Sequence, residues 1–338
     1  MIPTILKTIL ITGGAGYIGS HTAFLMHQKG YQVVILDDYS QNQVFNHNWA
    51  TVIKSDFADD KILNEIFTNY KIEAVMHFAA FIEVNESIHN PLKYYLNNVS
   101  KTIQLLNAML KHGVNKFIFS SSCAIYGNPE FLPLTEDHPK NPLSPYGQSK
   151  LMIEKVLNDL SDSNNLKYVS LRYFNASGSL PEHELGEQHT PETHLIPLLL
   201  RAAQNNKPFT IYGTDYPTKD GTCVRDFVHV LDIAQAHLLA LQHLNNGNPS
   251  DCFNLGTGLG VSIKEIIQMV EHLYRNKLNI LFAKRRIGDA AILVADATKA
   301  NNILKWKPKY SDLEFILRSA YAFENSKQIV LEKIGILS

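Results

Sequence analysis

Short apolar runs alternate with helical patterns through the first half of the chain. Runs typical of strands cover residues 9–12, 32–36, 52–54, 74–80, 117–119 and 167–172. Between them, apolar residues recur at helical spacing over 22–29, 61–70, 91–112 and 146–160. Strands regularly followed by helices predict right-handed βαβ units, and therefore a doubly wound parallel sheet with its ligand at the carboxyl ends of the strands.

A glycine-rich loop joins the first strand to the first helix. Gly13, Gly16 and Gly19 form a Gly-x-x-Gly-x-x-Gly pattern, which lets a backbone approach a pyrophosphate at a helix N-terminus. Such a triplet alone is weak evidence. The next strand, however, ends at Asp37, where a carboxylate can accept hydrogen bonds from an adenosine ribose. Asp37 and Asp38 would repel a 2′-phosphate, so NAD is favoured over NADP.

The composition of the chain changes around Asn175. Beyond it, the segments 181–191 and 212–221 are long and rich in polar and turn-forming residues, which suits a lobe built around a ligand. The predicted fold class is α/β: a Rossmann-type doubly wound parallel sheet with a smaller C-terminal α/β substrate-binding domain. We expect an NAD-binding domain over 1–178 and a substrate domain mainly over 179–338, with some segments of the latter returning to the former.

A Tyr-x-x-x-Lys pair opens the predicted helix at 146–160. Tyr146 and Lys150 are one helical turn apart, so their side chains point the same way. A neighbouring cation favours phenolate, and a pKa lowered by roughly three units would make Tyr146 a base near neutral pH. Ser122, at the end of the strand beginning at Phe117, can share a substrate hydroxyl's hydrogen bond. An isolated pair of this kind is usually a surface pair, but the dinucleotide loop upstream favours a catalytic site.

Charge and cysteine content narrow the class of protein further. The 338 residues carry a net charge of -1 with interspersed signs, which gives no footprint for nucleic acid. The chain has an odd number of cysteines without metal-ligand spacing, namely Cys123, Cys223 and Cys252. This pattern predicts a protein of the reducing cytoplasm, with no disulfide and no metal. The apolar run at 9–12 is too short for a signal segment, and no window is long enough to span a bilayer.

Several motifs, taken in order, carry a family resemblance. They are the loop at Gly13, Ser120-Ser121-Ser122, Tyr146-Gly147-Gln148-Ser149-Lys150, Arg172-Tyr173-Phe174-Asn175, the segment Gly221 to Val230, and Arg286-Ile287-Gly288-Asp289. Together they resemble the extended short-chain dehydrogenases/reductases, most closely the UDP-glucose 4-epimerase group of that family. The resemblance covers nearly the whole chain.

The resemblance implies that NAD is the cofactor and assigns residues to it. Those expected to bind NAD are Gly13, Gly16, Tyr17, Ile18, Gly19, Asp37, Asp56, Phe57, Phe78, Ala79, Ala80, Asn97, Lys150 and Tyr173. Asp56 and Phe57 would contact the adenine, and Lys150 the nicotinamide ribose. The segment 39–51 is short and leaves the contacts at the adenosine end open.

The resemblance also implies the reaction, which is the interconversion of UDP-glucose and UDP-galactose through a transient 4-keto sugar. Tyr146 would be the base, Lys150 its activator, and Ser122 the group that orients the 4-hydroxyl. The residues expected to bind the UDP-sugar are Ser122, Tyr146, Asn175, His194, Leu195, Tyr212, Arg225, Arg286, Asp289 and Leu293. His194 stands where some relatives have an asparagine. A branched apolar residue at Leu293 is expected to favour glucose and galactose over N-acetylated sugars. By the same resemblance, the helices at 91–112 and 146–160 are expected to form a homodimer.

Other functions remain open at this level. A 4-epimerase of UDP-GlcNAc, a UDP-pentose or a UDP-uronic acid would carry the same motifs. A 4,6-dehydratase of the superfamily would need a carboxylate where this chain has Ser122-Cys123-Ala124. A non-catalytic sensor of NAD or nucleotide sugars would have no need of Ser122, Tyr146 and Lys150 together.

Overall fold

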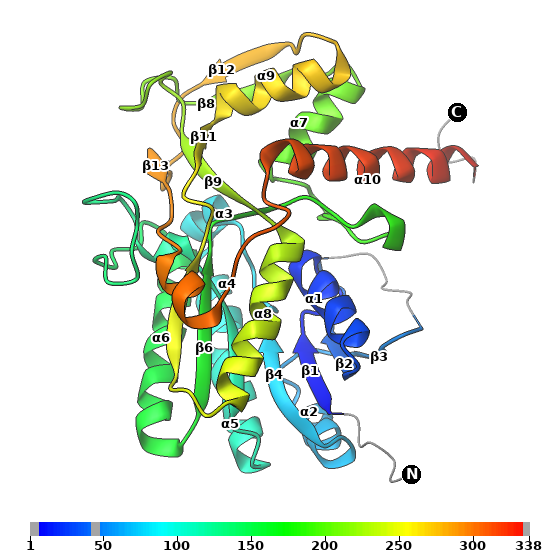
Figure 1. The fold of residues 1–338 in the computed structure, drawn as a ribbon, viewed down its shortest axis with the longest axis vertical. Helices are drawn as coiled ribbons and strands as arrows, with labels where there is room; N and C mark the ends of the chain where they lie inside the picture. Colours follow the sequence, from blue (N-terminus) through cyan, green and yellow to red (C-terminus); the bar gives the residue numbers. More distant parts are fainter. Residues whose placement is uncertain (1–6, 42–47, 334–338) are drawn as a thin grey trace.

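A parallel sheet of seven strands forms the centre of the larger lobe (Figure 1). In this computed structural model, which describes residues 7–41 and 48–333, the strand order is β10-β6-β5-β4-β1-β2-β3. These strands are β1 (Thr8–Thr12), β2 (Gln32–Asp37), β3 (Thr51–Lys54), β4 (Ile72–His77), β5 (Lys116–Ser122), β6 (Lys167–Tyr173) and β10 (Asp251–Leu255). Every pairing within the sheet is parallel, which confirms the doubly wound prediction. Residues 42–47 of the short segment 39–51 lie outside the described residues.

Helices cover both faces of this sheet and enclose two separate cores. One face is covered by α1 (Tyr17–Gln28) and α8 (Val230–Asn245), the other by α2 (Asp60–Asn69), α5 (Thr102–Lys111) and α6 (Pro145–Asn164). Successive residues of β1 belong to different cores: Ile9 and Ile11 pack in the core on the first face, and Leu10 packs in the core on the second. Side chains alternate across a strand, so an unbroken apolar run is buried on both sides.

Two differences from the predicted element boundaries bear on the site. The first helix begins at Tyr17 rather than at Thr22, because the backbone becomes helical directly after Gly16 and continues through Gly19, a poor helix former. The fourth strand ends at His77, and residues 78–80 belong to the loop that follows it. With these boundaries, the glycine-rich loop after β1 and the loop after β4 lie at the same edge of the sheet.

The helix expected over 91–112 is not one α-helix. It consists of α4 (Pro91–Tyr94), a π-helical segment (Tyr95–Lys101) and α5. Within the wider turns Asn98 is buried, and its side chain bonds both the N–H and the carbonyl of Phe81, each at 2.9 Å. π-Helical turns often occur at functional sites. Here the turn ties the loop after β4 to the helix layer.

A smaller lobe stands above the carboxyl ends of the large sheet (Figure 1). Its strands are β7 (Asn175–Ser177), β8 (Phe209–Tyr212), β9 (Val224–His229), β11 (Gly260–Ser262), β12 (Ile280–Ala283) and β13 (Ile292–Leu293). β9 pairs with β7, β11 and β13, while β8 pairs with β12. The helices α7 (Leu195–Gln204), α9 (Ile263–Tyr274) and α10 (Leu313–Lys333) enclose an apolar core with these strands.

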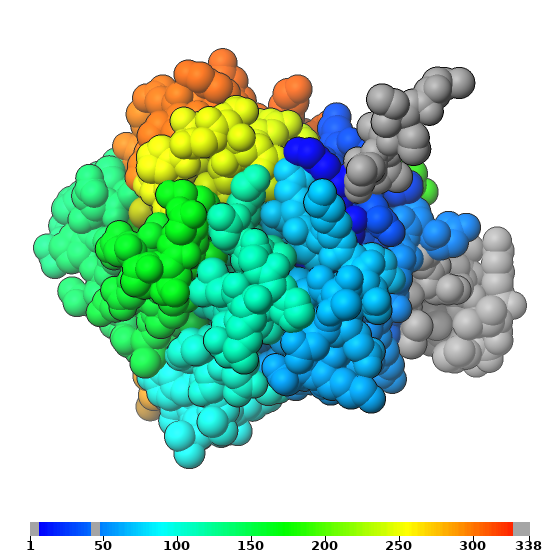
Figure 2. Space-filling view, turned by 90° about the horizontal axis from the view of Figure 1, so that it is seen from below, coloured from blue at the N-terminus to red at the C-terminus, as the bar shows by residue number. Residues whose placement is uncertain are grey.

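Late segments of the chain contact the larger lobe. β10 extends the sheet beside β6, and Trp306 is buried in the same core as Ile9. Seen from below, the yellow segment near 250 adjoins the green segment near 161–168 (Figure 2), where Ser250 accepts a hydrogen bond from the backbone of Tyr168 at 3.1 Å. The larger lobe is therefore assembled from both halves of the sequence.

The remaining elements are short. They are α3 (Val84–His89), the 3-10 turns Cys123–Ile125 and Pro181–His183, and a π-helical segment at Ala300–Leu304. The proline-rich stretch 127–144 holds no helix or extended strand, as expected; it forms one β-bridge, between Leu134 and Ala295, and Leu134 and Glu136 also accept hydrogen bonds from Asn254. Among the described helices, none is long and apolar enough to cross a membrane.

Candidate active site

The structure brings Ser122, Tyr146 and Lys150 together at the carboxyl edge of the sheet. Ser122 is the last residue of β5, and α6 starts at Pro145 under a Ser144 side chain that accepts the Gly147 N–H at 3.2 Å. This cap fixes the first turn of α6. The Nζ atom of Lys150 lies 5.9 Å from the centre of the Tyr146 ring, one turn along the helix.

In the protein without cofactor, burial is the largest influence on the pKa values of Tyr146 and Lys150. It raises the pKa of Tyr146 to about 12, while a hydrogen bond with Ser122 acts to lower it. It lowers the pKa of Lys150 to about 7, against the opposing charge of Glu154. The depressed Tyr146 pKa expected from the sequence is therefore not found. The loss of water around the phenol outweighs the interactions that lower its pKa, and the Nζ atom of Lys150 bonds to the Ser120 carbonyl at 2.7 Å.

The glycine-rich loop packs too closely for larger residues. Gly13 has a φ of 71°, and a Cβ there would lie 2.5 Å from the backbone nitrogen of Ala79. A Cβ on Gly19 would lie 2.2 Å from the Gly13 carbonyl oxygen. The loop therefore needs glycine for close approach of backbone to backbone. The hydroxyl of Tyr17 donates a hydrogen bond to the Gly178 carbonyl at 2.6 Å, so only the backbone of Tyr17 is available at the start of α1.

The carboxylate of Asp37 lies against this loop. Its Oδ2 atom accepts the Ala15 N–H at 3.0 Å and its Oδ1 atom accepts the Tyr39 N–H at 2.9 Å. Asp37 is buried, and burial raises its pKa although both hydrogen bonds act to lower it. The loop and the end of β2 are thereby held in one fixed arrangement.

The other expected cofactor residues line the same edge. The backbone N–H groups of Phe78 and Ala79 both donate to the Thr12 carbonyl, at 2.9 and 3.1 Å. Phe78 and Tyr173 both pack against the ring of His237, with centroid distances of 4.6 and 5.9 Å. These contacts hold the carboxyl ends of β1, β4 and β6 close together.

The adenine-end residues are partly engaged within the protein. Asp56 forms an ion pair with Lys101 and accepts the Ala58 N–H at 2.9 Å. The ring of Phe57 is buried against His77, so only its backbone can contact a ligand directly. Asn97 lies in the π-helical segment and donates to Asn98 at 3.0 Å.

The residues expected to hold UDP form two pairs in the smaller lobe. The guanidinium of Arg286 lies 3.9 Å from the centre of the Tyr212 ring. Arg225 lies 3.9 Å from an oxygen of Asp289 and stands opposite Leu293 in the β9–β13 register. A stacked arginine retains donors at its edge, so Arg286 can still bond a diphosphate.

The last three expected substrate residues occupy different elements. Asn175 begins β7, where it stands opposite Phe227 of β9. Leu195 is the first residue of α7 and packs against its apolar core. The Nδ1 atom of His194 contacts Glu187 at 2.9 Å and Glu192 at 3.0 Å, which raises the pKa of His194 well above its usual value. Only the other ring nitrogen of His194 is left to face a substrate.

Comparison with known proteins places this geometry in a family. Residues 9–256 match the model of the NAD dependent epimerase/dehydratase family. The chain belongs to this family. A UDP-glucose 4-epimerase of Rhizobium meliloti is 45% identical over 322 residues, which cover 95% of this chain and 98% of the relative.

Solved structures agree with the family assignment. The UDP-glucose 4-epimerase of Brucella ovis in complex with NAD has a TM-score of 0.90 at 44% identity, and the match covers 93% of this chain and 97% of that one. The enzyme of Bifidobacterium longum in complex with NAD+ and UDP has a TM-score of 0.90 at 35% identity, with 95% and 99% covered. The family confirms the expected α/β fold, the enzyme class and NAD as cofactor.

The residues present fit the family's dinucleotide. The first turn of α1 has no acidic residue and no side-chain cap, so its N–H groups can bind a pyrophosphate. Among the described residues, each oxygen of Asp37 accepts one hydrogen bond, and a carboxylate can accept about four hydrogen bonds in all. The remaining capacity of the carboxylate suits ribose hydroxyls.

Sequence reasoning missed two supports of this family's site. Asn98 bonds the loop after β4 and also donates to Ser149 of α6 at 3.3 Å. Glu154, one turn beyond Lys150, is buried and forms a bidentate pair with Arg172 at 2.9 and 2.6 Å. A buried acid on α6 facing an arginine at the end of a strand was visible in the sequence only as two separate charges.

Proposed function

We propose that this protein is an NAD-dependent UDP-glucose 4-epimerase, which interconverts UDP-glucose and UDP-galactose. The observation that carries the proposal is the grouping of Ser122, Tyr146 and Lys150 at the sheet edge that also holds the glycine-rich loop and Asp37. A binding protein that senses nucleotides would need the loop but not a phenol beside a buried lysine.

The residues of the larger lobe would hold the cofactor. The N–H groups at Gly16, Tyr17 and Ile18 would contact the pyrophosphate, and Asp37 the adenosine ribose. Lys150 would donate to the nicotinamide ribose. Phe78, Ala79, Ala80, Asn97 and Tyr173 would line the channel, and Asp56 with the backbone of Phe57 would meet the adenine.

Tyr146 would move the proton at the sugar. Bound NAD supplies the electron-pair acceptor for C4 and a positive ring charge that favours the phenolate form of Tyr146. Tyr146 removes the proton of the 4-hydroxyl, which Ser122 orients, and returns it once the sugar has turned its other face. The raised pKa of Tyr146 in the chain by itself suits the second role, since a phenol must be protonated to donate.

The smaller lobe would hold UDP and leave the hexose free to turn. Arg225 and Arg286 would neutralise the diphosphate, Asp289 would accept ribose hydroxyls, and Tyr212 would lie beside the uracil. Asn175, His194 and Leu195 would complete the site. Anchoring through the nucleotide supplies orientation without fixing the face of the sugar.

The position of Leu293 supports a preference for simple hexoses. It lies directly opposite Arg225 in the β9–β13 pairing. A branched side chain at this place would limit the room for an N-acetyl group. We therefore place UDP-GlcNAc below UDP-glucose and UDP-galactose as a substrate.

The dehydratase alternative lacks a group to carry it. After Ser122 the chain continues with Cys123, whose pKa burial raises to about 12. A protonated, buried thiol cannot supply the acid and base that elimination needs. No carboxylate stands at this point of the chain.

We further propose that the protein is a homodimer located in the cytoplasm. Exposed apolar side chains lie on α4, the π-helical segment, α5 and α6, namely Leu92, Leu96, Ile103 and Met152. They support a homodimer through these helices. The three cysteines are free thiols, which supports a reducing compartment, the cytoplasm. A division into domains at 178/179 is supported by β10 and α8, which return to the first lobe, while β7, just before this boundary, pairs with β9 of the smaller lobe.

One assay tests the proposed function. The purified protein is incubated with UDP-galactose without added NAD, and UDP-glucose is followed by chromatography. Conversion towards equilibrium is expected, with UDP-GlcNAc turned over more slowly. Absence of UDP-glucose both with and without added NAD would reject the proposal.

A further inference from the structure

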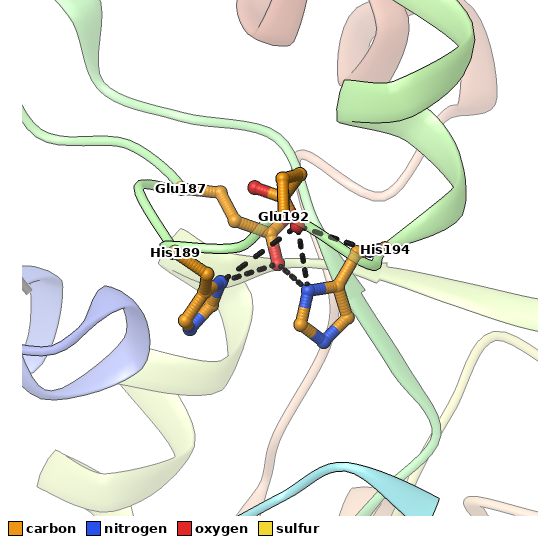
Figure 3. Close-up of side chains that lie close together, drawn as sticks. All are labelled: Glu187, His189, Glu192 and His194. Atoms are coloured by element: carbon orange, nitrogen blue, oxygen red, sulfur yellow. Dashed lines mark hydrogen bonds and ion pairs between the residues drawn. The ribbon is translucent and has the colours of Figure 1, made fainter. Parts of the chain in front are cut away.

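Two histidines and two glutamates converge in the segment between β7 and α7. They are Glu187, His189, Glu192 and His194, and each offers one possible ligand atom (Figure 3). All four atoms lie within 4.8 Å of one another. The residues belong to a single short stretch of chain, which folds back so that their polar ends meet.

The spacing of these atoms is close to that of a four-coordinate metal site. The His194 Nδ1 atom lies 2.9 Å from Glu187 and 3.0 Å from Glu192. The His189 Nδ1 atom lies 3.5 Å from Glu187 and 3.9 Å from Glu192. Zinc–ligand bonds of about 2.0–2.1 Å place tetrahedral ligands about 3.3–3.4 Å apart. Small shifts would centre an ion among the four.

The cluster contains polar atoms that its own contacts do not satisfy. The Glu192 side chain is only 2% exposed. Within the described part of the chain, its Oε2 atom and the His189 Nδ1 atom are shielded from solvent yet have no hydrogen-bond partner. Leaving such atoms unsatisfied is unfavourable, so an additional group that bonds to them would be favoured.

The charges in the cluster also call for a cation. Glu187 and Glu192 are both buried carboxylates, and Arg201 reaches Glu192 only at 3.7 Å while it binds Glu324 more closely at 3.0 Å. Buried carboxylates are normally paired with a charge or bound to a metal, and here both share the imidazoles of His189 and His194. One divalent ion bound to those two rings would take over this pairing and neutralise both carboxylates.

We propose that Glu187, His189, Glu192 and His194 bind one divalent transition-metal ion, for which Zn²⁺ is the best match. Imidazole nitrogen with carboxylate oxygen suits zinc, and neutral histidines with two carboxylates give a neutral site. Four protein ligands leave no open position, so the ion would be structural and would not activate water.

The surroundings supply the outer contacts of such a site. The Glu192 Oε1 atom accepts the backbone N–H groups of Thr193 and His194, at 2.9 and 3.0 Å. Thr193 in turn donates to Glu83, in the loop after β4, at 2.5 Å. An ion here would fasten the start of α7 to the larger lobe. This inference stands independently of the proposed epimerase activity.

Metal content measured on the full chain tests the site. The protein is dialysed with ZnCl₂, then against metal-free buffer, and its zinc is measured by mass spectrometry. Wild type should retain about one ion per chain. His189→Asn and Glu192→Gln should weaken Zn²⁺ binding by more than the about 10- to 100-fold that loss of an outer contact costs. His183→Asn, an exposed histidine in the same segment, is the matched control and should bind as wild type does.

A spectroscopic measurement on the wild-type protein tests the site even if the variants do not fold. Stoichiometric Co²⁺ in place of Zn²⁺ should give the intense visible absorption of a four-coordinate site. Zn²⁺ should also raise the midpoint of thermal unfolding in wild type and His183→Asn, but not in His189→Asn. Lack of the cobalt spectrum in wild type, or equal zinc retention in all four proteins, would overturn the proposal.

Discussion

The Nζ atom of Lys150 donates a hydrogen bond to the carbonyl oxygen of Ser120 at 2.7 Å, across the boundary between α6 and β5. Because burial also lowers the pKa of Lys150 to about 7, the ammonium form is lost as the pH rises through neutrality in the protein without cofactor. The protonation of Lys150 therefore links cofactor binding to pH.

We expect NAD to bind more weakly as the pH rises above 7. An ammonium donates better to ribose hydroxyls than a neutral amine, and the Kd for NAD should rise by at most about tenfold per pH unit. Calorimetric titration of cofactor-free protein between pH 6 and 9 measures it. Lys150→Met should show a flat profile. A wild-type Kd independent of pH would remove Lys150 from this role.

Tyr146→Phe is expected to lose turnover while keeping its cofactor. Loss of a general acid and base typically costs about 10²- to 10⁴-fold in kcat. The variant should still copurify with NAD, because the phenol contributes to the sugar chemistry rather than to dinucleotide affinity. Tyr168→Phe, on the neighbouring strand β6, is the control and should leave kcat unchanged. Normal turnover by Tyr146→Phe would exclude the assignment.

Asp37→Ala is expected to weaken NAD retention. Hydrogen bonds to a charged group contribute about 1.5–3 kcal/mol, which corresponds to about 10- to 100-fold in Kd. Discrimination against NADP should fall as well, because the repelling carboxylate is gone. Asp38→Asn changes the adjacent carboxylate, which accepts the local Ser40 N–H, and serves as the control for NAD retention. Unchanged NAD affinity in Asp37→Ala would show that the ribose lies elsewhere.

Two consecutive arginines allow a matched test of the UDP site. Arg286 stacks on Tyr212, whereas its neighbour Arg285 stacks on Tyr216 and pairs with Asp215 at 2.7 Å. Arg286→Gln should raise the KM for UDP-galactose by about tenfold or more, since a charge-assisted contact to phosphate is lost. Arg285→Gln should stay within about twofold of wild type. Steady-state kinetics distinguishes the two, and equal effects would contradict the placement.

Acid should destabilise the protein through its buried histidines. The ring of His77 lies between the hydroxyls of Thr12 and Thr102, at 2.6 and 2.9 Å, and burial lowers the pKa of His77 to about 3. Below the unfolded-state pKa near 6.5, His77 binds a proton in the unfolded chain but stays neutral in the folded chain. Stability is therefore lost as the pH falls from about 6.5 towards 3.

A single variant isolates this contribution. Between pH 7 and pH 5, His77 should account for about 2 kcal/mol of the loss in unfolding free energy. Urea unfolding of His77→Asn at both pH values should show a correspondingly smaller difference than wild type. An identical difference would mean that His77 is not kept neutral by the fold.

The dinucleotide half of the site could be predicted from sequence because its parts are local. Gly13, Gly16 and Gly19 stand at fixed positions between a strand and a helix, and Asp37 ends the very next strand. The sequence predicts that the first helix begins at Thr22, whereas it begins at Tyr17. The reason is Gly19, which lowers helix propensity but is required there because it packs closely against Gly13.

Features that depend on burial could not be read from the chain. The pKa of Tyr146 follows from how deeply α6 packs, and the π-helical turn around Asn98 follows from contacts with a loop far away in sequence. The Glu187 to His194 cluster has the pattern Glu-x-His-x-x-Glu-x-His, which matches no common metal-ligand spacing and lies in a segment without regular helical or strand periodicity. Only the fold shows that its four side chains face one another (Figure 3).

β10 reaches its place beside β6 only after about three quarters of the chain has been made. Until residue 255 has left the ribosome, β6 is an edge strand with open hydrogen-bonding groups, the kind of surface on which chains aggregate. A nascent chain stalled near residue 178 would therefore need chaperones, and the first lobe expressed as a fragment should collect in inclusion bodies unless β10 is supplied.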